Sequence, residues 1–464
     1  MTDHNTICAL ATPSGMGAIS IIRLSGEKAI EITDKNFTPH TEGKKLKDQK
    51  ANTIHVGTIS NNEEQLDEVV ISIFRAPNSY TGEDIVEIAC HGSTYIQKQI
   101  LQLFLDSGAR MAQPGEFTQR AFLNGKIDLS QAEAVADLIS ATTRSSQRIA
   151  MKQMRGGFSS DLAILREQLV KFSSLIELEL DFSDEDVEFA DREKLQQLIC
   201  QIEKKVVTLR DSFHLGNVIK DGIPVAIVGE TNVGKSTLLN TLLNEDKAIV
   251  SNIHGTTRDI IEDTVNLQGT NFRFYDTAGL RETIDTIEKL GIERTYSAMK
   301  NALIVLLVVD TTNASSIVLK RINKIREIMS NDQFLIITAN KIDIGNPETL
   351  KILKNIPLVE REKLVLLSAK WKDNIDGLIS IMKTMVNIED SGSDTIVSNV
   401  RHYDALSRAS EAIERIKNGM EQQISGEFLT RDISDCMNSI GEITGEISND
   451  EILGHIFKNF CIGK

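Results

Sequence analysis

The sequence lacks the features that mark secreted, metal-centred and membrane proteins. Its five cysteines are odd in number, widely scattered and without a CxxC pair, which argues against a disulfide framework or a zinc site. The longest dense apolar run, Ala302 to Val309, has eight residues, whereas a helix that spans a bilayer needs about 20. The first residues do not form a basic stretch followed by a long apolar core, so no signal peptide is expected. These absences predict a cytoplasmic protein without a membrane segment.

Positive charge is also scarce. The 464 residues carry a net charge of −15, with a pI near 5.2. This balance argues against a protein that grips nucleic acid by bulk positive charge. It leaves room for a local basic patch, or for a partner subunit that holds the nucleic acid. The length favours about three domains.

The N-terminal segment, residues 1–125, has the pattern of a mixed α/β domain. β-rich runs bounded by turn residues predict strands, and an apolar 3.6-residue period predicts a helix that ends at Ser107-Gly108. The strands are expected at Ala18 to Leu24, Glu68 to Phe74 and Asp84 to Cys90, and the helix at Tyr95 to Leu105.

Two segments, residues 126–218 and 386–464, have helical patterns with little glycine or proline. Long helices are expected at Gln131 to Arg155 and Ser160 to Phe182, with helical structure again from Val400 to Phe460. Because helical segments precede and follow an α/β segment, we expect one helical domain with the α/β domain inserted into it.

The inserted segment, residues 219–385, alternates apolar strands with helices. This alternation predicts a mostly parallel sheet that is covered on both faces. The expected strands are PVAIVG, FRFYDT, LIVLLVVD, FLIITANK and LVLLSAK. The predicted fold class is therefore a multidomain α/β plus all-α protein.

A phosphate-binding loop opens the inserted domain. GETNVGKS, Gly229 to Ser236, matches GxxxxGK[ST] between an apolar strand and a helical stretch, which is the context this motif needs. Backbone N–H groups of such a loop wrap phosphates, and the helix points its positive end at them. The residues expected to contact nucleotide here are Asn232, Val233, Gly234, Lys235, Ser236 and Thr237, with Lys235 on the outer phosphates and Ser236 on magnesium.

Three further motifs follow in the order of a GTP-binding domain. An aspartate in NKID, at the end of a strand, can accept two hydrogen bonds from guanine, whereas adenine offers no such pair and would leave the carboxylate unsatisfied. A DTAG stretch closes another strand, where its aspartate can hold magnesium through water and its glycine can approach the γ-phosphate. The third motif, SAK, follows the last strand and would back the base. The motif residues are Asp276, Thr277, Ala278, Gly279, Asn340, Lys341, Asp343, Ser368, Ala369 and Lys370.

Two loop features bear on hydrolysis. The polar loop Ser251 to Ile260 is placed to be the first switch loop, with Thr257 a candidate magnesium ligand. Leu280 follows the DTAG glycine, where Ras-like proteins have the glutamine that orients the attacking water. A leucine cannot do this, so another group must, or hydrolysis is poor.

The role of Asn232 in the phosphate loop has two interpretations of similar weight. Asparagine stabilises local turns well. Its amide oxygen also suits a monovalent cation beside the phosphates, because hard cations prefer oxygen ligands.

The chain resembles, over essentially its full length, the family of tRNA-modification GTPases called MnmE or TrmE. The nucleotide motifs alone fit many GTPases, whereas the outer stretches and the terminal tetrapeptide make the resemblance specific. It is carried by ATPSGMGAISIIRLSG, SYTGEDIVEIACHG, GEFTQRAFLNGKIDLSQAEAVADLI, GETNVGKSTLLN, GTTRD, DTAGLRE, IEKLGIER and the terminal Cys461-Ile462-Gly463-Lys464, which matches CxGK.

The resemblance implies an N-terminal folate-binding and dimerising domain, a helical domain, and a Ras-like G domain inserted into it. With the FAD-binding partner MnmG, such proteins modify C5 of the wobble uridine of certain tRNAs. They add an aminomethyl or carboxymethylaminomethyl group from a tetrahydrofolate one-carbon unit, carried as a formyl or methylene derivative. GTP hydrolysis is required, and potassium stimulates it when two G domains pair transiently across the homodimer.

The resemblance also assigns residues in the G domain. Asn232, Ser251, Ile253 and Thr256 match potassium-coordinating positions, with Ile253 acting through its backbone carbonyl. Ser236 and Thr257 match the magnesium ligands. Glu288 matches the glutamate that orients the hydrolytic water, although by itself it reads as an exposed helix carboxylate.

At the folate site the matching residues are Arg23, Glu83, Lys126 and Lys464. A carboxylate suits the amino and N–H edge of a pterin, and cations suit the carboxylates of folate. Without the resemblance Arg23 reads as an ordinary flanking charge. Cys461 is a possible modification-centre residue, but the sequence also allows an incidental thiol in a frayed tail.

Two other functions compete with this one. A GTP-dependent ribosome-assembly switch would predict an RNA-binding appendage such as a KH domain, but only a helical pattern follows the G domain. A membrane-remodelling GTPase would need an amphipathic basic helix, which is missing. The tRNA-modifying GTPase is the favoured hypothesis.

Overall fold

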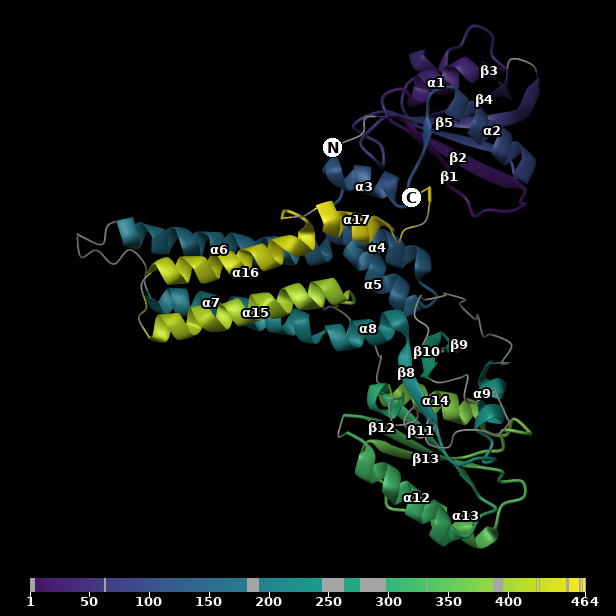
Figure 1. Cartoon of the computed structure of the whole chain (residues 1–464), viewed down its shortest axis with the longest axis vertical. Coiled ribbons are helices and arrows are strands. Elements are labelled where there is room, and N and C mark those ends of the chain that lie inside the picture. The colour runs from purple at the N-terminus through teal and green to yellow at the C-terminus, as the bar shows by residue number, and fades with distance from the viewer. Residues whose placement is uncertain are drawn as a thin grey trace. The chain divides into compact units, whose positions relative to one another are not determined.

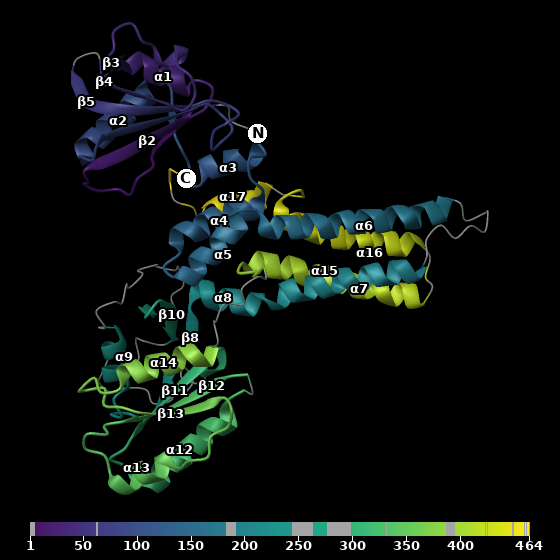
Figure 2. The same ribbon diagram turned by 180° about the vertical axis from the view of Figure 1, so that it is seen from behind.

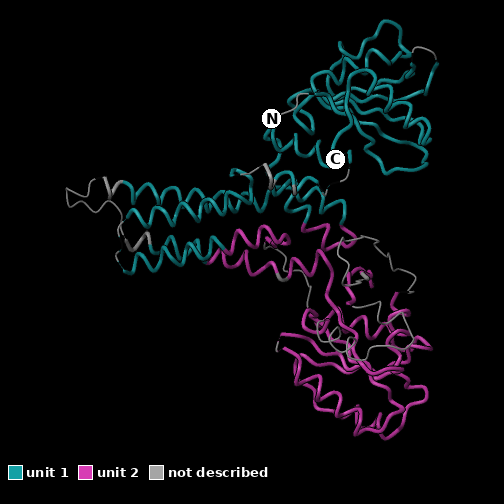
Figure 3. Tube along the Cα trace, viewed as in Figure 1, with its two compact units in different colours: residues 1–140, 150–203, 408–464 teal, residues 141–149, 204–407 magenta. Residues whose placement is uncertain are grey.

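The computed structural model describes residues 5–61, 64–181, 192–243, 263–275, 298–330, 332–386, 395–422, 424, 426–447, 450–458, 460 and 462–463. The chain forms two compact units (Figure 3). Unit 1 contains residues 1–140, 150–203 and 408–464, and unit 2 contains residues 141–149 and 204–407. Among the described helices, none is both long enough and apolar enough to cross a bilayer.

Unit 1 begins with a seven-stranded, mostly antiparallel sheet in the order β3-β4-β5-β6-β2-β1-β7. The strands predicted from the sequence correspond to β2, β5 and β6, which are confirmed; the short strands β1, β3 and β7 and the longer β4 were not predicted. The bounds are β1 (Ile7–Leu10), β2 (Ile19–Ser25), β3 (Phe37–Pro39), β4 (Thr53–Ser60), β5 (Gln65–Phe74), β6 (Ile85–His91) and β7 (Arg110–Met111).

Two helices, α1 (Ala29–Asn36) and α2 (Thr94–Asp106), cover one face of this sheet (Figures 1 and 2). Ile100 and Phe104 of α2 are fully buried and belong to the same core as the inward-facing strand residues. Because strand side chains alternate between faces, Val69, Ile71 and Ile73 of β5 enter this core. The predicted helix is confirmed as α2.

The opposite face of the sheet is covered at β1, where Ile7 and Ala9 pack against Phe117 of α3 (Glu116–Leu123), and is open over β4 and β5. Ile54, Val56 and Val70 are 69%, 46% and 40% exposed, and Val56 lies directly opposite Val70 in the ladder between β4 and β5. On β2, Ile19 is 67% exposed. The open face therefore presents branched apolar side chains where a one-sided sheet normally presents polar ones.

The rest of unit 1 is helical. Apolar residues of α6 recur at steps of three and four, from Leu162 through Leu165 and Leu169 to Phe172, and all are buried. This stripe packs along α16, which has the same spacing. The helices that lie wholly in unit 1 are α3 (Glu116–Leu123), α4 (Leu129–Ser140), α6 (Gly157–Asp181), α16 (Gly426–Thr444) and α17 (Asp450–Lys458), and α5 (Arg144–Met154), α7 (Arg192–Asp211) and α15 (Val400–Glu421) contribute residues to both units.

The prediction of one helix over Gln131 to Arg155 is wrong. The structure has two helices, α4 and α5, separated by residues 141–143. The Thr143 hydroxyl accepts from the backbone N–H of Ser146 at 3.0 Å, and the Thr143 N–H donates to the Ser146 hydroxyl at 3.2 Å. This reciprocal cap starts a new helix, and the apolar period did not reveal it. The helix predicted over Ser160 to Phe182 is confirmed as α6.

Unit 2 contains a six-stranded sheet in the order β13-β12-β11-β8-β10-β9. All neighbouring pairs are parallel except β9 with β10. The five predicted strands are confirmed and β9 was missed. The bounds are β8 (Ile223–Val228), β9 (Asp263–Leu267), β10 (Thr270–Tyr275), β11 (Ile304–Asp310), β12 (Phe334–Asn340) and β13 (Glu362–Leu366).

Helices cover both faces of this sheet, as predicted. Every residue of β11 is buried, with Ile304, Leu306 and Val308 on one face and Val305 and Leu307 on the other. The first face packs against α9 and α14, and the second against α12. The unit 2 helices are α8 (Phe213–Asp221), α9 (Lys235–Leu243), α12 (Ser315–Ile328), α13 (Pro347–Lys354) and α14 (Ile375–Val386).

Candidate functional site

The predicted phosphate-binding loop, Gly229 to Ser236, connects β8 to α9 in unit 2. Gly234 has φ +100°, and a Cβ there would collide with the side-chain nitrogen of Asn340. Asn340 in turn donates from Nδ2 to the carbonyl of Val233 at 2.8 Å. Glycine therefore lets the loop approach the strand end that carries the base motif, and one amide joins the two motifs.

Lys235 stands at the start of α9, where the sequence places it on phosphate oxygens. Its ammonium donates to the carbonyls of Gly229 and Glu230 at 2.9 and 2.5 Å. Burial lowers the pKa of Lys235 below its ordinary value. Because the helix end adds positive potential, a phosphate that accepts from Lys235 at this position would be favoured.

The NKID segment, predicted to recognise the base, is organised by Lys341. This residue has φ 65°, and its ammonium donates to the carbonyl of Asn232 at 2.9 Å and pairs with Asp310 at 2.6 Å. The contact joins the phosphate loop to the end of β12. It also fixes the backbone of Asn232, itself at φ 64°. Asp310 was not singled out from the sequence; its place at the end of an apolar strand was the available signal.

The Asp343 carboxylate is exposed and held by two neutral donors. The Ser368 hydroxyl donates to Oδ1 at 2.7 Å, and the Trp371 indole N–H donates to Oδ2 at 3.2 Å. The Ser368 hydrogen bond, with smaller contributions from the backbone N–H of Asp343, the Trp371 hydrogen bond and the Lys370 charge, holds the pKa of Asp343 below its ordinary value. Ala369 donates its backbone N–H to Asn340 at 2.9 Å. The structure therefore brings the phosphate-loop, NKID and SAK residues together; sequence reasoning missed Trp371.

Several predicted residues lie outside the described part of the chain. They are Ser251, Ile253, Thr256, Thr257, Asp276, Thr277, Ala278, Gly279 and Glu288 in unit 2, and Cys461 and Lys464 in the C-terminal tail. Their predicted roles stay predictions.

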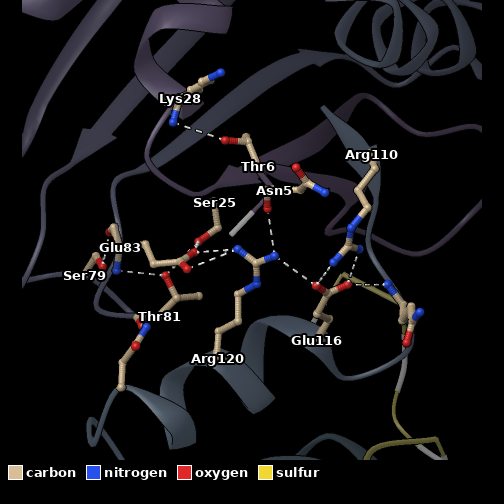
Figure 4. Close-up of polar contacts among 12 residues, drawn as sticks. Asn5, Thr6, Ser25, Lys28, Ser79, Thr81, Glu83, Arg110, Glu116 and Arg120 are labelled. Atoms are coloured by element: carbon tan, nitrogen blue, oxygen red, sulfur yellow. Dashed lines mark hydrogen bonds and ion pairs between the residues drawn. The ribbon is translucent and has the colours of Figure 1, made fainter. Parts of the chain in front are cut away.

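In unit 1, Glu83 belongs to a charged network that includes Arg120 and Glu116 (Figure 4). Arg120 donates to both carboxylate oxygens of Glu83 at 3.1 and 3.0 Å and to Glu116 at 3.0 Å. Ser25 donates to Glu83 at 2.7 Å. The Glu83 side chain keeps 25% exposure, so an ion pair orients a carboxylate that solvent still reaches. Arg120 and Glu116 were not predicted.

Arg23 lies on β2, two residues before Ser25. Its guanidinium lies 5.9 Å from the Tyr80 ring centroid and 5.6 Å from that of Phe117, distances typical of cation–π contacts. It pairs with Glu87 at 2.6 Å and donates to the carbonyl of Gly463 at 3.3 Å. Because Glu83 accepts from Ser25, two residues after Arg23 on the same strand, Arg23 and Glu83 lie in one region of unit 1.

The C-terminal tail reaches the same region. Gly463 has φ +94°, and a Cβ there would collide with the carbonyl of Leu10. A glycine is therefore required for the tail to lie against the end of β1. Lys126, the remaining described folate candidate, donates from its ammonium to the carbonyl of Pro77 at 2.9 Å and is exposed.

The buried thiols are poorly suited to nucleophilic chemistry. Burial raises the pKa of Cys8 and Cys90 to about 11 and that of Cys436 to about 12, so all three stay protonated at neutral pH. Within the described ranges, no group of three or more His, Cys, Asp or Glu residues could hold a metal ion.

Comparison with known proteins agrees with this arrangement. The family model of the MnmE helical domain matches residues 129–461, and that of the GTP-binding protein TrmE N-terminus matches residues 6–126. The tRNA modification GTPase MnmE of Bacteroides thetaiotaomicron is 54% identical over 467 residues, which cover 100% of both chains. The MnmE proteins of Parabacteroides distasonis and Flavobacterium johnsoniae are each 52% identical, covering 99% and 100% of this chain and 100% of their own.

The matches extend over the N-terminal sheet, the helices and the inserted nucleotide-binding domain alike. The phosphate loop, NKID and SAK residues meet in one place, as a GTP site requires, within a chain that is matched end to end. The chain belongs to the MnmE (TrmE) family of tRNA modification GTPases.

Proposed function

We propose that this GTPase, together with an FAD-binding MnmG partner, modifies C5 of the wobble uridine of certain tRNAs. The product would carry an aminomethyl or carboxymethylaminomethyl group derived from a formyl- or methylene-tetrahydrofolate. The observation that carries the proposal is the match of both the N-terminal and the helical family models in one chain. That match favours tRNA modification over a ribosome-assembly switch. With a net charge of −15, we expect the partner to supply much of the tRNA-binding surface.

Magnesium and potassium are proposed to act at the phosphate loop. Ser236 and Thr257 would ligate magnesium. Asn232, Ser251 and Thr256, with the Ile253 carbonyl, would ligate potassium. This donor set fits, because hydroxyl, amide and carbonyl oxygens are the ligands of hard cations. The Lys341 contact supports the role of Asn232, since it fixes the backbone of a residue whose side chain is exposed.

Bound potassium would supply positive charge beside the phosphates where negative charge develops. Lys235 would hold the outer phosphate oxygens. Glu288 is proposed to orient the attacking water, a task that Leu280 cannot perform because it has no polar side-chain atom.

The folate derivative is proposed to bind in unit 1 near Arg23, Glu83, Lys126 and Lys464. The described residues fit such a group. Glu83 keeps an accessible carboxylate that suits the N–H edge of a pterin, and Arg23 offers a cation beside the Tyr80 ring. Gly463 brings the tail to Arg23. Lys464, and the possible modification-centre residue Cys461, belong to the same C-terminal tail in the sequence and are proposed to act on the same group.

A homodimer through the N-terminal domain is also proposed. The open sheet face with Ile19, Ile54, Val56 and Val70 presents apolar side chains that are 40% exposed or more. A second copy of the same face would bury them, because cyclic dimers use one self-complementary patch. Pairing of the two G domains would then be transient and linked to the nucleotide.

Nucleoside analysis tests the reaction itself. tRNA from cells that lack this protein should contain wobble uridines without the C5 group, and the gene supplied in trans should restore it. Unchanged wobble uridines in the deletion strain would contradict the proposed function.

GTPase rates in potassium and in sodium test the cation site. We expect faster hydrolysis in potassium for the wild type and no potassium response for Asn232→Ala. Glu288→Ala should lose hydrolysis while keeping GTP binding. Equal wild-type rates in the two salts would refute the cation proposal while leaving the tRNA reaction untouched.

A further inference from the structure

Trp371 is the only tryptophan of the chain, and its environment is unusual for an exposed indole. The side chain is 66% exposed, yet its N–H is directed at Oδ2 of Asp343, at 3.2 Å. A solvated indole has water available as an acceptor. The geometry therefore links Trp371 to the carboxylate that the sequence predicts to read guanine.

The Asp343 carboxylate receives one donor on each oxygen. Ser368, which is 1% exposed, donates to Oδ1 at 2.7 Å, and Trp371 donates to Oδ2. Each carboxylate oxygen has two lone-pair sites. Two donors therefore fix the rotation of the carboxylate and leave one site on each oxygen. A guanine ring offers two adjacent N–H groups, which match two such sites as a parallel pair.

Hydrogen bonds join the two ends of the loop that carries Trp371. Ser368 and Asp373 exchange backbone hydrogen bonds of 3.2 and 3.0 Å. Asn374 donates from its side chain to the carbonyl of Leu366 at 2.8 Å. The Lys370 ammonium lies 5.2 Å from the Trp371 ring centroid, within reach of a cation–π contact. Hydrogen bonds thus hold the loop that carries the indole, and Lys370 contacts the face of the indole ring.

We propose that Trp371 is a positioning residue for guanine recognition, which holds the Asp343 carboxylate so that both of its oxygens face the base. This inference rests on the proposed role of Asp343 and adds a specificity element that the GTP motifs do not contain. Ser368 and Trp371 together form a clamp on the Asp343 carboxylate, in which Ser368 is the buried donor and Trp371 is the exposed donor. A fixed carboxylate makes both bonds to guanine, but only one to hypoxanthine, which lacks the amino group.

The test compares full-length wild type and Trp371→Phe by calorimetric titration with GDP and with IDP. Phenylalanine keeps an aromatic ring beside Lys370 but has no N–H donor. We expect GDP affinity to fall roughly 3- to 10-fold, the effect of one lost hydrogen bond to a charged group that water partly replaces. IDP affinity should fall less, so the preference for GDP over IDP narrows. The unfolding midpoint without nucleotide should not change.

Wild-type fluorescence gives a second readout, because tryptophan emission comes from Trp371 alone. GDP should shift the indole emission and IDP should shift it less. Asp343→Asn serves as the control for the underlying role. If Asp343→Asn binds GDP as the wild type does, the guanine-reading role itself fails.

Two outcomes would overturn the inference while leaving that role intact. In both, Asp343→Asn loses GDP affinity. In the first, Trp371→Phe binds GDP and IDP with wild-type affinities. In the second, Trp371→Phe loses equal affinity for both nucleotides, which would mean that the indole only packs the loop.

Discussion

The two units hold carboxylates in opposite ways. In unit 1, Glu116 is 8% exposed at its side chain and paired with two arginines, Arg110 and Arg120. In unit 2, Asp343 is exposed and held by the neutral donors Ser368 and Trp371. A carboxylate neutralised by arginines stabilises the fold around it. A carboxylate oriented by neutral donors keeps its negative charge and free lone pairs for a ligand.

Glu83 lies between these cases. It shares Arg120 with Glu116, but its side chain is 25% exposed and it also accepts from the Ser25 hydroxyl. The same arginine therefore serves a buried carboxylate on one side and an accessible one on the other. The comparison predicts that changes in unit 1 act first on stability, and changes around Asp343 act first on ligand binding.

Among these variants, Arg120→Met should lower the free energy of unfolding the most. It removes the partner of two carboxylates, one of them buried, and loss of one member of a buried ion pair typically costs about 3–5 kcal/mol. Urea unfolding and hydrogen exchange of β2 amides would measure it. Lys35→Met is the matched control, because Lys35 and Glu31 form an exposed pair and the midpoint should stay unchanged. Equal midpoints for the two variants would remove the distinction between the two ways of holding a carboxylate.

Glu116→Gln should act on stability in a pH-dependent way. Burial raises the pKa of Glu116, but hydrogen bonds from Arg110 and the Gln113 backbone and the nearby arginine charges outweigh it, so the pKa of Glu116 lies below its ordinary value. A lowered folded-state pKa contributes stability at pH values above the ordinary pKa, and that contribution is lost as the pH falls through the folded-state pKa.

The glutamine variant should therefore be less stable by about 1.5–3 kcal/mol at neutral pH. The difference from the wild type should narrow on acidification below the ordinary pKa. Unfolding midpoints measured at several pH values would show this. A gap that stays constant with pH would mean that packing, rather than the charge of Glu116, carries the effect.

Ser368→Ala should have the smallest effect on stability and a clear effect on binding. The variant frees Oδ1 of Asp343 while Trp371 still holds Oδ2, so GDP affinity should drop roughly fivefold. Calorimetry measures this, with Thr384→Val as the control, since that hydroxyl donates to the carbonyls of Ser380 and Ile381 within α14. In the double variant with Trp371→Phe the losses should not add, because both residues orient one carboxylate. Strict additivity would argue against a shared clamp.

Sequence patterns predicted long apolar strands and helices well and short or capped elements poorly. The five predicted strands of the unit 2 sheet are apolar runs with turn residues at their ends, so periodicity and flanking turns were sufficient. The break between α4 and α5 depends on hydrogen bonds between Thr143 and Ser146, which an apolar period does not record. The strands β1, β3 and β7 are two to four residues long and are formed by pairing rather than by propensity.

The residues of the candidate sites also differ in whether the sequence alone reveals them. Phosphate-loop and NKID residues are contiguous in sequence because one turn of backbone must wrap a phosphate or a base edge, and such motifs can be read directly. Asp310, Trp371 and Arg120 could not be, because each acts on a residue distant in the chain. Arg120, for example, is 37 residues from Glu83 and 115 from Asn5.

The amino-acid sequence by itself determined the family, the order of helical and α/β segments and the presence of a GTP motif set, because these depend on local spacing and on the period of apolar residues. Only the tertiary structure decided how each carboxylate is held. Whether an aspartate or glutamate meets an arginine or a neutral donor depends on which strands pair and which loops close. That partner sets the charge, the orientation and the free lone pairs on which a ligand would depend.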